Sequence, residues 1–307
     1  MSELTLRSVV RRLFVALAAF LLAANASARA QERPTVVTVN YALGYFAERL
    51  GGSEIDVVFP VPDGVDPSFW RPGISDISTM QGADLILLNG AGFATWTAKA
   101  SLPRSRIVDT SRGFEDRFIA AETVTHSHGP GGEHSHTGTA SFTWLDQQQA
   151  ILQASAIAGA LAQRGLVAPD MIDTRLAALT EDLSAIDAAA RRLRPLAESK
   201  VLIATHPRYQ YFARAYGLNI QSLEWEAGAA PDADQLAELE ALVDDTGAQV
   251  LIWEAQPPDE ARAAIRDLGL ADVVFRTLAT TPEGSDYVER IREAVHDLAD
   301  VLASFDR

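Results

Sequence analysis

The feature that most constrains the fold is a regular alternation of short apolar runs with amphipathic segments, which occurs twice along the chain. The first set of apolar runs covers residues 34–40, 54–61, 83–89 and 105–111, and the second covers residues 200–206, 219–225, 248–256 and 271–279. Strands that alternate with helices are typical of parallel sheets with right-handed crossovers. We therefore predict an α/β fold of two similar lobes, each built on a parallel sheet.

A long helical segment separates the two sets. Residues 169–199 contain no glycine, begin with a proline and carry apolar residues at helical spacing. The pattern predicts one long rigid helix between the lobes, in which Pro195 can introduce a kink or an early end. The predicted organisation is an N-terminal lobe at 31–166, a connecting helix at 167–199 and a C-terminal lobe at 200–307.

Residues 1–30 have the pattern of a secretory signal peptide. Three arginines precede an apolar run at residues 13–24, and the tripeptide that ends at Ala30 is typical of a cleavage site. The apolar run is too short to cross a bilayer, so we expect cleavage near Ala30 and a periplasmic protein. The chain contains no cysteine, and we therefore expect neither a lipid nor another direct membrane anchor. Its net charge of −15 argues against nucleic acid as a partner.

The stretch THSHGPGGEHSH, residues 125–136, holds four of the six histidines of the chain. His126 and His128 form one His-x-His pair, and His134 and His136 form another beyond a glycine-rich break. Neutral imidazole is a good ligand for zinc and other transition metals, so we predict metal binding by this loop. A solvated loop without a role and a contact with a partner protein are the alternatives.

Four segments, in this order along the chain, resemble those of one protein family. They are the stretch from GGSEIDVVFPVPDGVDPSFW to LLNGAGFATW, the histidine-rich insert, the segment TASFTWLDQQQAILQASAIAGAL, and ATHPRYQYFARAYGLNI. Together they resemble the metal-specific solute-binding proteins of ABC transporters, the zinc and manganese family. The resemblance implies two lobes with a metal held between them by one ligand from each of four loops.

Three of the four implied ligand positions have other residues here. Ser68 stands where the family has its first histidine, and Phe142 stands at the second position. The third ligand is retained as His206, whereas the fourth position falls on Thr277 or Thr281. One histidine cannot form a four-coordinate zinc site, so the implied interlobe site is incomplete.

Glu254 is a further candidate ligand, because it ends an apolar run and would face the same cleft as His206. Hydrogen bonding within the protein is the alternative for His206, and a helix cap or an arginine pair is the alternative for Glu254. Aromatic residues near the changed positions indicate interlobe packing, or else a cleft for an organic ligand. These aromatics are Phe69, Trp70, Phe142 and Trp144.

We therefore predict a periplasmic solute-binding protein that captures metal and delivers it to an inner-membrane ABC permease. Zinc is the expected cargo, with manganese or another divalent transition metal as alternatives, and we expect a monomer. One alternative function is binding of a chelated metal or small organic ligand in an aromatic cleft. Another is an accessory zinc chaperone. The motifs of hydrolases, P-loop enzymes and zinc proteases do not occur, so we do not expect an enzyme.

Overall fold

The computed structural model describes residues 33–121, 125–127, 133–135 and 138–305, with the backbone alone within residues 121–137. The predicted signal peptide lies outside the described residues, as do His128 and His136.

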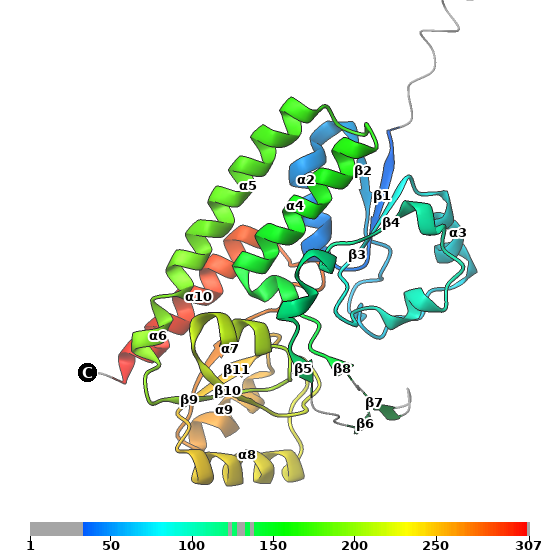
Figure 1. Ribbon diagram of the computed structural model, residues 1–307. Coiled ribbons are helices and arrows are strands. Elements are labelled where there is room, and N and C mark those ends of the chain that lie inside the picture. The colour runs from blue at the N-terminus through cyan, green and yellow to red at the C-terminus, as the bar shows by residue number, and fades with distance from the viewer. Residues whose placement is uncertain (1–32, 122–124, 128–132, 136–137, 306–307) are drawn as a thin grey trace, which may run out of the picture. The chain divides into compact units, whose positions relative to one another are not determined.

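Each lobe is built on a four-stranded parallel sheet, and the two sheets share one strand order (Figure 1). The first sheet runs β2 (Asp56–Val58), β1 (Thr35–Thr38), β3 (Leu85–Leu88), β4 (Ile107–Asp109). The second runs β10 (Asn219–Ser222), β9 (Val201–Ala204), β11 (Val250–Trp253), β12 (Ala271–Val274). All neighbouring strands in these two sheets are parallel. The predicted fold class, two parallel-sheet α/β lobes, is confirmed.

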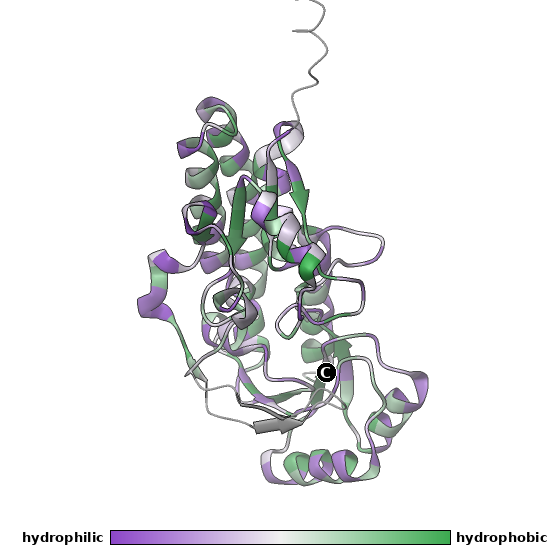
Figure 2. Ribbon diagram, turned by 90° about the vertical axis from the view of Figure 1, so that its right-hand side faces the viewer, coloured by the Kyte–Doolittle hydropathy of each residue, from purple (hydrophilic) through white to green (hydrophobic). Residues whose placement is uncertain are grey.

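The central strands of each sheet are apolar because helices cover them on both faces. β11 is buried at every position, and β1 and β3 are buried at three of four. Continuous apolar runs are typical of parallel strands between helices. Several strand segments are accordingly green, that is hydrophobic, in Figure 2, whereas α8 (Ala233–Thr246) alternates between hydrophilic and hydrophobic residues.

Helices connect and cover the strands. Besides α8, they are α2 (Tyr41–Gly51), α3 (Ile74–Gly82), α4 (Gln147–Gln163), α5 (Pro169–Ala190), α6 (Leu193–Leu196), α7 (Gln210–Tyr216), α9 (Asp259–Asp267) and α10 (Tyr287–Ser304). In the part of the chain that the structure describes, none of these helices has the length and apolarity needed to cross a bilayer.

The helix α5 joins the two lobes, and it is shorter than the sequence pattern predicts. It ends at Ala190, and the chain turns before the short helix α6, which contains Pro195. Proline lacks the N–H that would continue the helical hydrogen bonds, which accounts for the break. Asp187, near the end of α5, accepts hydrogen bonds from Gln148 Nε2 at 2.9 Å and from the Tyr216 hydroxyl at 3.2 Å. The connecting helix is thereby bound to both α4 and α7.

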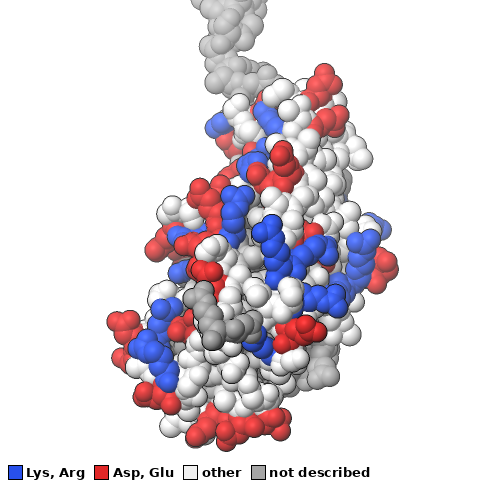
Figure 3. All heavy atoms as spheres, turned by 90° about the vertical axis from the view of Figure 1, so that its left-hand side faces the viewer, with Lys and Arg blue, Asp and Glu red and all other residues white. Residues whose placement is uncertain are grey.

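Acidic side chains gather on the outer helix of the C-terminal lobe. The helix α8 carries five carboxylates and no lysine or arginine. Elsewhere on the face seen in Figure 3, basic and acidic side chains are interspersed. The negative charge of the chain is therefore concentrated in part on α8.

Candidate functional site

His206 and Glu254 meet at the edge of the C-terminal sheet. His206 follows β9 closely and Glu254 follows β11 directly, and these two strands are neighbours at the point where the strand order reverses. Such a reversal leaves a crevice at the carboxyl ends of the strands, where ligands bind in α/β sheets. His206 Nδ1 lies 3.4 Å from Glu254 Oε2. The structure thus brings two of the predicted ligands together.

Arg208 forms an ion pair with the carboxylate of Glu254. Its Nε is 3.1 Å from Glu254 Oε2, and only 7% of its side chain is exposed, against 10% for Glu254. The backbone N–H of Glu254 donates a hydrogen bond to the Thr205 hydroxyl at 3.2 Å, which fixes the start of this turn. Burial raises the pKa of Glu254, and the nearby Arg208 offsets only part of that effect.

Asp66 reaches the same arginine from the N-terminal lobe. Its Oδ2 forms a short ion pair with Arg208 Nη2, and its Oδ1 accepts a hydrogen bond from the backbone N–H of Ser68 at 2.8 Å. Burial alone would raise the pKa of Asp66, but Arg208 and Ser68 outweigh it and hold the pKa below its ordinary value. Burial would likewise lower the pKa of Arg208, but Asp66 and Glu254 raise it above its ordinary value. The guanidinium is therefore a permanent cation between two carboxylates.

Phe142 forms the floor beneath Arg208. The guanidinium carbon lies 4.6 Å from the centre of the Phe142 ring, a cation–π distance. The ring is in turn packed against Trp144 and Phe93, at centroid distances of 4.8 Å and 5.7 Å. The residue at the second implied ligand position therefore supports the arginine.

Thr277 completes the surroundings of Glu254. Its hydroxyl donates to Glu254 Oε1 at 3.2 Å, and its carbonyl oxygen accepts a hydrogen bond from Trp144 Nε1 at 2.6 Å. The second of these bonds links the lobes. Thr281, the other candidate for the fourth position, is exposed and lines a pocket beside the cluster.

That pocket has a volume of about 560 Å³, which falls in the range of small-molecule sites. Asp66, Arg208, Glu254 and Thr277 contribute to its wall. Of the four aromatic residues noted in the sequence, none lines this pocket within the described residues. Instead Trp70 packs edge-on against Trp96 at 5.3 Å. Trp70, Phe142 and Trp144 are thus buried in the protein interior and do not line this pocket.

Comparison with known proteins identifies the family. A model of the family described as "ZnuA: Zinc-uptake complex component A periplasmic" matches residues 36–301. The chain belongs to this ZnuA family. Membership confirms the resemblance to metal ABC transporter substrate-binding proteins, and it confirms a binding role in transport in place of an enzymatic one.

Individual relatives and structures agree with this assignment. The manganese ABC transporter substrate-binding lipoprotein PsaA of Streptococcus pneumoniae is 29% identical over 218 residues, 68% of either chain. The high-affinity zinc uptake system protein ZnuA of Bacillus subtilis is 25% identical over 312 residues, 94% of this chain and 97% of its own. The crystal structure of the Zn(II)-bound ZnuA-like domain of Streptococcus pneumoniae AdcA has the same fold. Its TM-score is 0.73 at 19% identity, over 88% of this chain and 99% of that domain.

The histidine loop of this ZnuA-family chain is described only as backbone. Its base is a pair of short strands, β5 (Ala120–Ala121) and β8 (Gly138–Thr139). Further out, β6 (Thr125–Ser127) pairs antiparallel with β7 (Glu133–Ser135), and the register sets His126 opposite His134.

The base of the loop is fixed to the C-terminal lobe. The Tyr211 hydroxyl, on α7, donates to the Ala140 carbonyl at 2.9 Å and accepts from the Ile119 N–H at 3.3 Å. Because α7 follows the turn that carries His206 and Arg208, the loop and the candidate site share one structural support.

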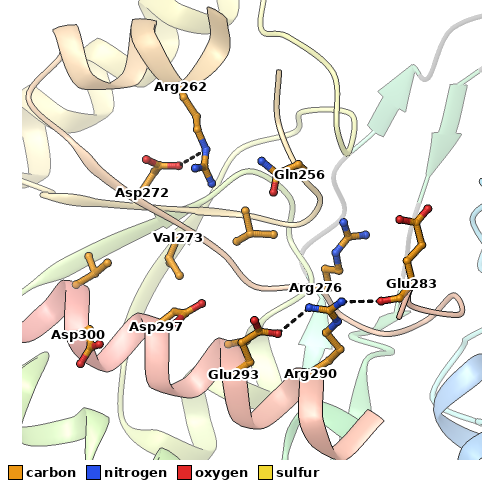
Figure 4. A pocket seen from close by; sticks show the side chains of 13 residues that line it. Gln256, Arg262, Asp272, Val273, Arg276, Glu283, Arg290, Glu293, Asp297 and Asp300 are labelled. Carbon is orange, nitrogen blue, oxygen red and sulfur yellow. Dashed lines mark hydrogen bonds and ion pairs between the residues drawn. The ribbon is translucent and has the colours of Figure 1, made fainter. Parts of the chain in front are cut away.

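A second hollow, of about 500 Å³, lies on the C-terminal lobe beside α10 (Figure 4). Four of the charged side chains that line it form two ion pairs. Arg262 Nε lies 3.0 Å from Asp272 Oδ2, and Arg290 binds both Glu293, at 2.7 Å, and the Glu283 carbonyl, at 2.6 Å. This hollow is therefore a charged surface that contains two internal ion pairs.

Within the described residues, no three histidine or carboxylate side chains are grouped closely enough to hold a metal ion. The donors of the cleft are His206 and the carboxylates of Asp66 and Glu254, with Arg208 between the latter two.

Sequence reasoning missed Arg208 and Asp66. The available signal was an arginine two residues after His206, the one implied ligand position that has a histidine in this chain. His296, outside this site, lies on the exposed face of α10.

Proposed function

We propose that this protein is the periplasmic component of a metal ABC importer that captures zinc through its histidine loop. The loop residues that bind the metal in this proposal are His126, His128, His134 and His136. The observation that supports it is the backbone register of β6 and β7, which sets His126 of the first His-x-His pair opposite His134 of the second. Imidazole nitrogen is a preferred zinc ligand.

Zinc is the proposed cargo, and manganese is the alternative. The family description and the name of the Bacillus subtilis relative refer to zinc, and the name of PsaA refers to manganese. Imidazole ligands suit zinc, whereas manganese prefers oxygen donors, so the composition of the loop favours zinc. The protein would act as a monomer and deliver the metal to an inner-membrane permease.

His206 and Glu254 form a second, weaker site in this proposal. The two side chains lie together, but Glu254 Oε2 also contacts Arg208. A metal that bound there would compete with the guanidinium for the same oxygen, and this competition accounts for the weakness.

Zinc titration by calorimetry tests the proposal. The variant His126→Ser, His128→Ser, His134→Ser, His136→Ser should lose one binding equivalent or at least about tenfold in affinity, about 1.4 kcal/mol. The variant Ser127→Ala, Ser135→Ala changes the same strands without removing imidazole and should bind as the wild type does. Unchanged affinity and stoichiometry in the histidine variant would contradict the proposal.

Delivery to a permease requires a second measurement. Cells that lack the protein should accumulate less ⁶⁵Zn from zinc-limited medium, and the wild-type chain should restore uptake. Restored zinc tolerance without restored uptake would indicate an accessory chaperone in place of an import component.

A further inference from the structure

Arg208 is the buried cation of the interlobe cleft. It contacts one carboxylate from each lobe, Asp66 and Glu254, which are separated by 188 residues of chain. An arginine side chain is not deprotonated in proteins, so this positive charge is permanent. The cleft is thus supplied with a cation by the chain itself.

The neighbouring side chains are arranged around this cation. Phe142 stacks beneath the guanidinium at 4.6 Å. The Ser68 N–H holds Asp66 at 2.8 Å, and the Thr277 hydroxyl holds Glu254 at 3.2 Å. Four separate loops therefore supply the side chains that surround this one buried arginine or hold its two carboxylate partners.

We propose that Arg208 weakens metal binding in the cleft, because its guanidinium takes the place of a divalent cation between Asp66 and Glu254. The inference rests on the weaker cleft site of the proposed function and names the residue that weakens it. It does not depend on whether the loop binds zinc.

Without Arg208, the cleft would lack the positive charge that balances Asp66 and Glu254. Removing one member of a buried ion pair leaves an uncompensated charge, and here two carboxylates would be left facing each other. A divalent cation carries the charge that balances both. His206 Nδ1 lies 3.4 Å from Glu254 Oε2, and imidazole and carboxylate are both ligand types that zinc binds, so these side chains could close on a zinc ion once the guanidinium no longer separates the carboxylates.

The test uses the full chain with the four loop histidines replaced by serine, so that any zinc binding that is measured can be assigned to the cleft. In this parent we expect zinc titration to show no binding at micromolar concentrations. Arg208→Ser in the same background should bind zinc about 100-fold more tightly than the parent does. Zinc should also raise the melting temperature of this variant but not that of the parent.

Three control variants assign the effect to the cleft. Arg208→Lys keeps the charge and should bind no better than the parent. Adding Glu254→Gln to Arg208→Ser should abolish the gain. Arg262→Ser, which breaks the ion pair with Asp272, should leave zinc binding unchanged. If Arg208→Ser does not fold without metal, Arg208→Gln keeps most of the side-chain volume and replaces it in the same titration.

The outcomes separate the inference from the proposed function. No gain in a folded Arg208→Ser or Arg208→Gln variant would overturn the role of Arg208, and so would tight zinc binding by the parent with Arg208 in place. Failure of the loop to bind zinc in the wild type would overturn the proposed function alone.

Discussion

The guanidinium of Arg208 stacks on the ring of Phe142 from the other lobe, 4.6 Å above its centre. The two residues are 66 positions apart in the chain, and their contact lies where the lobes meet. A phenyl ring at this position offers no metal ligand, but it gives a buried cation a favourable neighbour.

Phe142→Ala should destabilise the protein by about 3–4 kcal/mol, because it removes a buried ring from the core and the support beneath Arg208. Urea unfolding monitored by circular dichroism measures the change. Ile74→Ala is the control, since Ile74 is 93% exposed and its loss should change the free energy of unfolding by less than about 0.5 kcal/mol. Equal effects of the two substitutions would contradict this assignment.

Arg208→Met should cost about 3–5 kcal/mol of stability, because Asp66 and Glu254 lose their cation while they stay largely buried. Arg290→Met breaks a more exposed pair, in which 57% of the Glu293 side chain is accessible, and should cost less than about 1 kcal/mol. Chemical denaturation of both variants in metal-free buffer compares the two costs. An Arg208 variant as stable as the Arg290 variant would show that the buried cluster contributes no net stability.

Glu224→Gln should change the pH dependence of stability. Burial raises the pKa of Glu224 to about 7 from the usual 4.5, Glu238 adds to the rise, and Arg208 opposes it. Because the folded state binds this proton more tightly than the unfolded state, the stabilising contribution is complete below about pH 4.5 and is lost as the pH rises through about 7.

The melting temperature of the wild type, relative to that of Glu224→Gln, should therefore fall between about pH 5 and about pH 8. Thermal melts across this range measure the difference. Glu226, two residues further on and exposed, provides the matched control Glu226→Gln. A difference that increases with pH, or does not change, would be inconsistent with the raised pKa.

Tyr211→Phe should loosen the base of the histidine loop. The substitution removes the hydroxyl that joins Ala140 and Ile119, at a cost of about 1 kcal/mol. Hydrogen–deuterium exchange should become faster in peptides that cover residues 119–121 and 138–140. Tyr216→Phe removes a hydroxyl that binds Asp187 and should leave exchange at the loop base as in the wild type. Unchanged exchange in Tyr211→Phe would show that the hydroxyl does not hold the loop.

Local sequence patterns predict most of the fold. All eight strands of the two sheets lie within the runs predicted from the sequence, and the central strands β1, β3, β9 and β11 are the most apolar because they are covered on both faces. The apolar helical pattern continues past Ala190, so the pattern alone does not show where the connecting helix ends, whereas Pro195 indicates the break in hydrogen bonding. The proximity of His206 and Glu254 follows from topology, because each residue ends one of two adjacent strands.

The arginine cluster could not be predicted in the same way. Asp66 and Arg208 lie on different lobes, and their pairing depends on how the lobes meet, which no local pattern encodes. Charged residues are also expected at the surface, so an arginine of which 7% is exposed runs against the usual distribution. Its role becomes visible only through its partners.

A tethered cation differs from a captured one in that dilution does not remove it. Metal held between two lobes dissociates as its free concentration falls, whereas the local concentration of Arg208 at Asp66 and Glu254 is set by the chain that carries it. The contact between the lobes would then be the same at low and at high concentrations of free metal. A partner protein that distinguishes the metal-bound from the metal-free form would then have to contact the histidine loop.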